Sequence, residues 1–260
     1  MDESLEFSIS LAHETGELLI SFFSQGGIHA SIKLDQTAVT EADFAADRLI
    51  TDRIHHNYPK DGIISEESSH FLTEINAPCW VIDPLDGTTN FSLGLPIWGV
   101  SIARLVDGHP DLGVLYFPLI NEIYTSKAGM GAYLNHQPIA TRAPDLAQPM
   151  SFFACCSRSF RRFDISIPYK PRIFGSGAYS FCMIARGSAL LALDAAPKIW
   201  DLAAAWLLVE EAGGLIDAFD GTQIFPLVEN LDYNTTDWPV LAACNPALME
   251  MGRKKIQRKR

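Results

Sequence analysis

The chain has 260 residues, of which 48% are apolar and 20% charged, with 18 glycines and 15 prolines. This composition is typical of a globular protein and excludes intrinsic disorder and collagen-like repetition. A net charge of −11 disfavours general nucleic-acid binding and suits a site that holds cations. The five cysteines include no C-x-x-C pair, so they are predicted to be small buried side chains rather than disulfide or zinc ligands.

The two ends of the chain carry opposite charges. Asp2, Glu3 and Glu6 stand where a secretory signal would need basic charge, and no apolar run approaches the roughly 20 residues that cross a bilayer. We therefore expect a cytoplasmic protein without membrane contact. Residues 253–260 hold six Arg or Lys and no acid, which is typical of a solvated helix end but could also bind nucleic acid or an acidic partner.

Two helices are predicted in the first 60 residues. Apolar residues recur at helical spacing from Leu5 to Phe23 and stop at Gln25-Gly26-Gly27. Thr40 and Asp43 then have the form of a capping box, and the apolar helix face behind them ends at Pro59.

After the second helix the pattern changes to short strands separated by Gly, Pro and Asp turns, which indicates an antiparallel sheet. The predicted strands are 62–65, 79–83, 98–106, 112–117 and 122–125. Beyond the aperiodic segment 141–149, strands and helices alternate as in a layered α/β unit. This half has predicted strands at 152–156, 190–194, 215–218 and 240–243, and predicted helices at 178–186, at 201–212 and from 246. We expect two tightly packed subdomains, 1–145 and 146–260.

The string Asp83-Pro84-Leu85-Asp86-Gly87-Thr88-Thr89-Asn90-Phe91 follows directly on the apolar run 80–82. A strand would deliver Asp83 to a sheet edge, and Asp86 could turn back beside it. Two carboxylates held so close repel each other unless a cation lies between them. Hard oxygen ligands, with the Leu85 carbonyl as a third, indicate Mg²⁺ rather than zinc.

The next residues of the string suit an anion. Gly87 has no side chain to block its approach, so the amides of Gly87 and Thr88 could hold a phosphate. The Thr88 hydroxyl could help to remove a proton from a metal-bound water.

Two further acidic elements fit the same site. Glu66 and Glu67 end a short predicted strand, where one could ligate a metal and the other support it. Asp201 begins a predicted helix. Each has a simpler interpretation, a solvated loop for the glutamates and a helix cap for Asp201.

Together these strings resemble the magnesium-dependent, often lithium-sensitive inositol monophosphatase family of phosphoesterases. The resemblance covers nearly the whole chain and rests on the segments 39–43, 66–68, 83–91, 129–135 and 200–214. It implies an α+β fold of the layered αβαβα sandwich type and a homodimer.

The resemblance also implies roles for individual residues. Two or three Mg²⁺ ions would be held by Glu66, Asp83, the Leu85 carbonyl, Asp86 and Asp201. The catalytic group would be Thr88 and Asp43, which orient the attacking water, and Glu67, which acts behind the ligands or on a third ion.

The substrate contacts follow in the same way. The amides of Gly87 and Thr88 would hold the phosphate, while Ser176, Gly177 and Ala178 would face the alcohol. Asp194 stands where many members carry a Glu that touches sugar hydroxyls, and it is one methylene shorter.

We therefore predict a phosphoric monoester hydrolase that converts inositol monophosphate to inositol and phosphate through a metal-activated water, without a phosphoenzyme. Fructose 1,6-bisphosphate, histidinol phosphate and 3′-phosphoadenosine nucleotides are alternative substrates for the same chemistry. A haloacid-dehalogenase-type phosphatase fits poorly because its D-x-D spacing differs from the D-x-x-D found here. The other alternative is a non-catalytic regulatory or scaffolding protein that binds partners through the basic tail.

Overall fold

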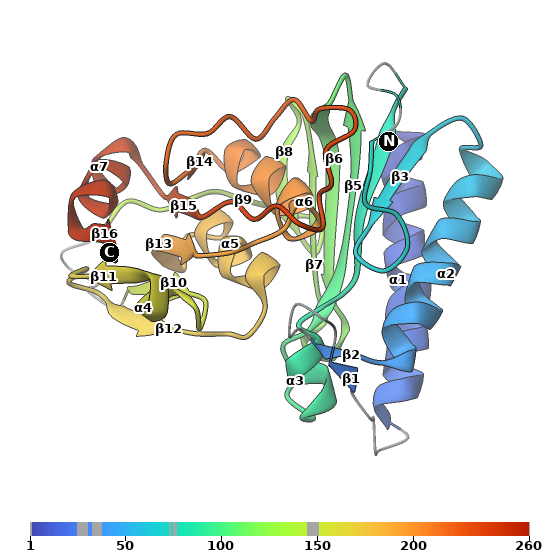
Figure 1. Cartoon of the computed structure of the whole chain (residues 1–260), viewed down its shortest axis with the longest axis horizontal. Helices are drawn as coiled ribbons and strands as arrows, with labels where there is room; N and C mark the ends of the chain where they lie inside the picture. The colour runs from blue at the N-terminus through green and yellow to red at the C-terminus, as the bar shows by residue number, and fades with distance from the viewer. Residues whose placement is uncertain are drawn as a thin grey trace.

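The structure, a computed structural model, describes residues 2–24, 31–32, 38–72, 74, 77–144 and 151–259. Figure 1 shows five layers in the order helix, sheet, helix, sheet, helix. Helices α1 and α2 cover one face of a large sheet, α5 and α6 lie between the two sheets, and α7 packs on the far side of the second sheet. The predicted layered α+β sandwich is confirmed.

Among the described residues, the five predicted helices lie close to their predicted positions, whereas two short helices at 88–92 and 159–162 were not predicted. The helices are α1 Glu3–Ser24, α2 Glu41–Asn57, α3 Thr88–Ser92, α4 Ser159–Arg162, α5 Gly177–Ala185, α6 Ile199–Glu211 and α7 Pro246–Lys255, with a 3₁₀ helix at Pro118–Ile120. The capping box of α2 is confirmed, because the Thr40 hydroxyl accepts from the Ala42 amide at 3.2 Å and the Asp43 carboxylate accepts from the Thr40 amide at 2.7 Å. The predicted stop at residues 25–27 lies outside the described residues.

The large sheet has the strand order β3-β4-β5-β6-β7-β8-β9. Its strands are β3 Gly62–Ser65, β4 Cys79–Asp86, β5 Gly99–Val106, β6 His109–Phe117, β7 Glu122–Lys127, β8 Gly131–Leu134 and β9 Gln137–Ile139. The prediction of an antiparallel sheet is wrong for β3, which pairs with β4 in parallel. The connection over residues 66–78 allows this, since a parallel crossover needs about a dozen residues.

The second sheet is mixed, with the order β12-β10-β13-β15-β14. Its strands are β10 Phe152–Cys155, β12 Lys170–Arg172, β13 Ala189–Asp194, β14 Leu215–Ala218 and β15 Val240–Ala243. Strand β10 pairs in parallel with both β12 and β13, so the carboxyl ends of these three strands lie at one edge. Two strand pairs lie outside these sheets, β1 Ser31–Ile32 with β2 Ala38–Val39, and β11 Phe163–Ile165 with β16 Ile256–Arg258.

The C-terminal tail departs from the prediction of a solvated helix end. Helix α7 ends at Lys255, and the next three residues form β16. Ile256 is buried in the larger hydrophobic core, which draws the chain back onto β11 instead of leaving it in solvent.

The larger core contains residues from both halves of the chain, among them Leu115 from β6 and Leu191 from β13. A smaller core lies between the large sheet and the helices α1 and α2. The boundary at residues 145 and 146 falls outside the described residues, so the division into two subdomains stays a prediction. None of the described helices has the length and apolarity needed to cross a bilayer.

Candidate active site

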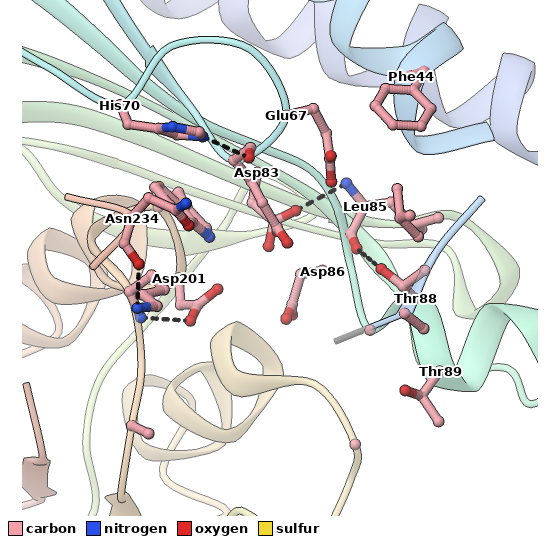
Figure 2. Close-up of a pocket in the computed structure, with 18 of the residues that line it drawn as sticks. Phe44, Glu67, His70, Asp83, Leu85, Asp86, Thr88, Thr89, Asp201 and Asn234 are labelled. Carbon is pink, nitrogen blue, oxygen red and sulfur yellow. Dashed lines mark hydrogen bonds between the residues drawn. The ribbon is translucent and has the colours of Figure 1, made fainter. Parts of the chain in front are cut away.

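The candidate site is a cavity of about 940 Å³ where the carboxyl ends of β3 and β4 meet the first turn of α6. Figure 2 shows Glu67, Asp83, Asp86, Thr88 and Asp201 around this space, contributed by the turn after β3, by β4, by α3 and by α6. Segments separated by more than a hundred residues therefore contribute to one wall.

Asp83 and Asp86 reach the same edge because β4 is irregular between them. The register between β4 and β5 shifts at this point, and the Leu85 amide donates to the Asp83 carboxylate at 2.9 Å. The sequence prediction that Asp86 turns back beside Asp83 is consistent with this geometry. Asp201 joins them from α6, where its carboxylate also accepts from the Lys198 amide at 2.8 Å. One carboxylate oxygen from each of the three aspartates lies within 4.8 Å of the others.

Burial sets the electrostatics of this trio. Asp83 and Asp86 are 2% and 6% exposed, and Asp201 is partly buried. Burial, aided by the neighbouring carboxylates, raises the pKa of Asp83 and of Asp201 and raises the pKa of Asp86 to about 6. Three ionised carboxylates this close are unfavourable without a cation, and a donor set made only of oxygen suits Mg²⁺.

The two glutamates are positioned by the parallel pairing of β3 with β4. The Glu66 amide donates to the Ile82 carbonyl at 3.3 Å, which places the turn after β3 beside the end of β4. His70 Nε2 lies 3.0 Å from the Glu66 carbonyl oxygen. Both glutamates line the cavity next to Asp83.

Asp47 supports this turn from α2. Its carboxylate accepts hydrogen bonds from the hydroxyls of Ser65 and Ser68, the latter at 3.2 Å. Asp47 is buried, one helical turn after Asp43 on the same face of α2. The sequence analysis did not identify it, although a polar residue on the buried face of a helix was the available signal.

Thr88 lies at the cavity wall with Asp43 directly behind it. The Thr88 hydroxyl is 2.9 Å from the Asp43 carboxylate and 3.1 Å from the Leu85 carbonyl. Burial raises the pKa of Asp43. Gly87 precedes Thr88 with φ of 93°, and a Cβ there would come 3.0 Å from the Ile97 carbonyl oxygen, so the turn requires glycine.

The loop before α5 holds Asp86 from the other half of the chain. The Ser176 hydroxyl and the Gly177 amide both donate to the Asp86 carboxylate, the amide at 3.2 Å. Asn90 fixes this loop, because its side-chain amide donates to the carbonyls of Ile97 at 2.6 Å and Phe174 at 2.7 Å. Asn90 belongs to the string 83–91 of the sequence analysis. Its role in joining the loops of Ile97 and Phe174 could not be predicted there, because Phe174 is far along the chain.

A second cavity of about 240 Å³ adjoins the first and is lined by Ser176, Gly177 and Asp194. Asp86 and Asp201 line both cavities. Asp194 is 8% exposed, and the Ala196 amide donates to its carboxylate at 3.1 Å.

The structure thus brings together most of the predicted site residues. Around the first cavity lie Glu66, Glu67, Asp83, Leu85, Asp86, Gly87, Thr88 and Asp201. Ala178 lines neither cavity, because its side chain is buried in the larger core. Arg158 and Lys198 also line the first cavity, and the sequence analysis did not single them out.

The five layers and the buried carboxylate cluster are those of a phosphatase, a hydrolase of phosphoric monoesters. The inositol monophosphatase family model matches residues 1–259, and the chain belongs to this family. The family is Mg²⁺-dependent, in agreement with the oxygen ligands of the cluster.

The similar proteins carry names that point to different functions. The chain is 33% identical over 232 residues to a histidinol-phosphatase of Chlorobaculum parvum, covering 86% of this chain and 88% of the relative. It is 34% identical over 242 residues to the Nus factor SuhB of Escherichia coli, covering 89% and 91%. Among solved structures, the extragenic suppressor protein suhB of Bartonella henselae has the same fold, with a TM-score of 0.82 at 24% identity over 97% of this chain and 98% of that one.

Proposed function

We propose that this chain hydrolyses the phosphate monoester of a small polyol or sugar, and that inositol monophosphate is a substrate. The observation that carries the proposal is the cluster of Asp83, Asp86 and Asp201 oxygens within 4.8 Å of one another, beside the Thr88 and Asp43 pair. A cluster of this kind next to an oriented hydroxyl suits the attack of water on phosphorus.

Two or three Mg²⁺ ions would be held by Glu66, Asp83, the Leu85 carbonyl, Asp86 and Asp201. When bound, Mg²⁺ lowers the pKa of water and neutralises charge on the phosphoryl oxygens. The chain prepares this site by fixing Asp86 through Ser176 and Gly177 and by placing the glutamate turn beside β4. Glu67, which also lines the cavity, is proposed to act behind these ligands or on the third ion.

Thr88 and Asp43 would orient the attacking water and move its proton. The Thr88 hydroxyl can accept a hydrogen bond from water while donating to Asp43, and a carboxylate whose pKa is raised by burial is a better proton acceptor. In an in-line displacement the phosphorus forms a bond to the water oxygen as the bond to the alcohol oxygen breaks.

The two sides of the substrate would be held by different parts of the chain. The amides of Gly87 and Thr88 are proposed to bind the phosphate oxygens at the cavity wall. Asp194, in the adjoining cavity, is proposed to accept hydrogen bonds from hydroxyls of the alcohol, with Ser176 and Gly177 beside it. Ala178, buried in the core, is left out of this set.

The proposal is tested by phosphate release from inositol 1-phosphate, fructose 1,6-bisphosphate, histidinol phosphate and adenosine 3′,5′-bisphosphate, each with Mg²⁺ and with chelator. We expect chelator-sensitive release from inositol 1-phosphate, and loss of that release in Asp83→Asn. No release from any of the four with Mg²⁺ present would contradict the proposal.

Three basic residues of the tail form ion pairs within the chain. Arg253 pairs with Asp217 at 3.0 Å, Lys254 with Glu250 at 2.6 Å and Lys259 with Asp164 at 3.7 Å. These pairs are exposed to solvent, so each contributes little to stability.

Three further properties are proposed from membership of the family: a homodimer, inhibition by Li⁺ and a cytoplasmic location. Free cysteines along the described chain are compatible with a reducing compartment. Light scattering on the purified protein and a Li⁺ titration of its activity test the first two, and fractionation of the source cells tests the third.

A further inference from the structure

His70 lies where three segments of the site meet. It follows the glutamate turn, residues 66–68, and it lines the cavity together with Trp200, the residue before Asp201. The amide of Tyr233, from the connection between β14 and β15, donates to the His70 carbonyl at 3.0 Å. One residue therefore joins the glutamate turn, the start of α6 and a loop from the second half of the chain.

The imidazole of His70 makes two contacts that differ in kind. Its Nε2 lies 3.0 Å from the Glu66 carbonyl oxygen, and because a carbonyl oxygen can only accept, Nε2 carries the hydrogen and donates it. The ring also packs on the indole of Trp200, with the ring centroids 5.8 Å apart and an angle of 40° between the planes. Figure 2 shows this side chain extending from the turn toward the cavity.

Trp200 is a fixed point against which the His70 ring can be held. Its side chain is buried, and its carbonyl accepts a hydrogen bond from the Ser101 hydroxyl of β5 at 3.1 Å. Asp201 is the next residue and belongs to the same first turn of α6. A group that packs on Trp200 is therefore held at a set distance from the Asp201 carboxylate.

Charge repulsion acts on the glutamate turn. Burial is the main cause that raises the pKa of Asp83, and the charge of Glu66 is the next. The pKa of Asp201 is raised by burial, and the charges of Asp86 and Glu66 add to this effect. Glu66 is thus close enough to be repelled by the aspartates, and in the metal-free protein this repulsion favours a turn displaced from the cluster. The hydrogen bond from His70 opposes that displacement.

We propose that His70 is a positioning residue, which holds Glu66 at the distance from Asp201 that lets carboxylates from both halves of the chain bind Mg²⁺ as one site. This inference rests on the proposed function, because it takes Glu66 and Asp201 as metal ligands. His70 then acts on the affinity for Mg²⁺, since groups that orient metal ligands change this affinity by about 10- to 100-fold.

Two variants separate the two contacts of His70. His70→Phe keeps a ring beside Trp200 and removes the donor, whereas His70→Gln keeps an N–H donor at similar reach and removes the ring. The same two changes at His56 are the matched controls. His56 is exposed in the last turn of α2, at the opposite end of this helix from Asp43 and the site.

The first readout is the unfolding temperature at increasing Mg²⁺ concentration, which reports Mg²⁺ binding without turnover. The second is phosphate release from inositol 1-phosphate over the same range of Mg²⁺. For His70→Phe, both curves should move to about tenfold higher Mg²⁺ or more, while kcat at saturating Mg²⁺ stays within about threefold of the wild type. His70→Gln should shift the curves less, because it can still donate to the Glu66 carbonyl. Both His56 variants should match the wild type.

An unchanged Mg²⁺ dependence of unfolding in His70→Phe would overturn the inference. A loss of unfolding temperature that is the same at every Mg²⁺ concentration would also overturn it, because His70 would then have only a structural role. The unfolding series needs no substrate. If the wild type gained stability from Mg²⁺ but released no phosphate from any ester, the proposed function would fail, and the unfolding of His70→Phe would still decide the inference. A wild type that Mg²⁺ neither stabilises nor activates would contradict both.

Discussion

The Thr88 hydroxyl lies 2.9 Å from the Asp43 carboxylate, although 45 residues separate the two in the chain. Asp43 uses its other carboxylate oxygen to cap α2 through Thr40, so one side chain both begins a helix and supports a candidate catalytic hydroxyl. The N-terminal cap of α2 therefore positions the carboxylate that Thr88 contacts.

Replacing Thr88 by alanine tests the role of its hydroxyl. Because the hydroxyl would transfer a proton from water to Asp43, Thr88→Ala should lower kcat by about 100-fold or more. Thr88→Ser keeps the hydroxyl and should retain most of the activity. Steady-state rates on inositol 1-phosphate provide the measurement, and a Thr88→Ala enzyme within threefold of the wild type would contradict the assignment.

Replacing Asp86 by asparagine tests the metal site. The change removes one carboxylate from a cluster that Mg²⁺ would neutralise, so kcat should fall by about 100-fold or more as several kcal/mol of charge stabilisation are lost. The metal-free protein should unfold at the same or a higher temperature than the wild type, because repulsion within the cluster is relieved. Thermal unfolding with and without Mg²⁺ should show a smaller Mg²⁺ shift for the variant, and an undiminished shift would argue against Asp86 as a ligand.

The stability of the metal-free protein should depend on pH through this cluster. The pKa of Asp86 is raised by burial from 3.8 to about 6, and the pKa values of Asp83 and Asp201 are raised in the same direction. The folded carboxyl binds its proton more tightly than the unfolded one, so its contribution to stability is present below pH 3.8 and is lost as the pH rises through about 6. In chelator, the free energy of unfolding of the wild type should therefore fall relative to Asp86→Asn between pH 4 and pH 7, at up to about 1.4 kcal/mol per pH unit. Urea unfolding at several pH values measures this difference. If the free energy of unfolding had the same pH dependence in both proteins, the prediction would be contradicted.

Asp47 should affect metal binding without touching the metal. Its carboxylate holds Ser65 and Ser68, which flank the glutamates. Asp47→Ala frees this turn. It should raise the Mg²⁺ concentration needed for half-maximal activity by about tenfold or more, as with other groups that hold metal ligands in place. Asp47→Asn keeps an acceptor oxygen and should show a smaller change. A Mg²⁺ titration distinguishes them, and equal half-saturation for Asp47→Ala and the wild type would rule out this role.

Replacing Asn90 should change both the KM for the substrate and the stability of the fold. Asn90→Ala would leave the Ile97 and Phe174 carbonyls without this partner, at a cost of about 1 to 3 kcal/mol each where they are buried. The loop that carries Ser176 would then be less firmly held, so KM should rise along with the loss of stability. Ser92→Ala, which removes only a hydrogen bond to the Thr88 carbonyl within α3, is the control. Stability lost without any change in KM would limit Asn90 to a structural role.

Local patterns predicted the elements that local physics determines. The apolar periodicity placed α1, α2 and α6 within a few residues, because a helix buries one face at a fixed spacing. The strand before Asp83 and the turn through Gly87 could likewise be predicted from the sequence, because Pro and Gly after a strand leave the backbone few conformations. The proximity of Asp83 and Asp86 follows from this short segment alone.

The tertiary structure decided which distant segments complete the site. Asp201 joins Asp83 because α6 packs between the two sheets, and Glu66 reaches β4 because β3 pairs in parallel, a register that no local pattern specified. Arg158 and Asp194 line the same cavity because β10 pairs in parallel with β13. These placements depend on how whole layers bury their apolar faces against one another, which is a property of the packed chain rather than of any segment. The sequence thus determined which side chains can perform the chemistry, and the packing of the layers determined which of them meet.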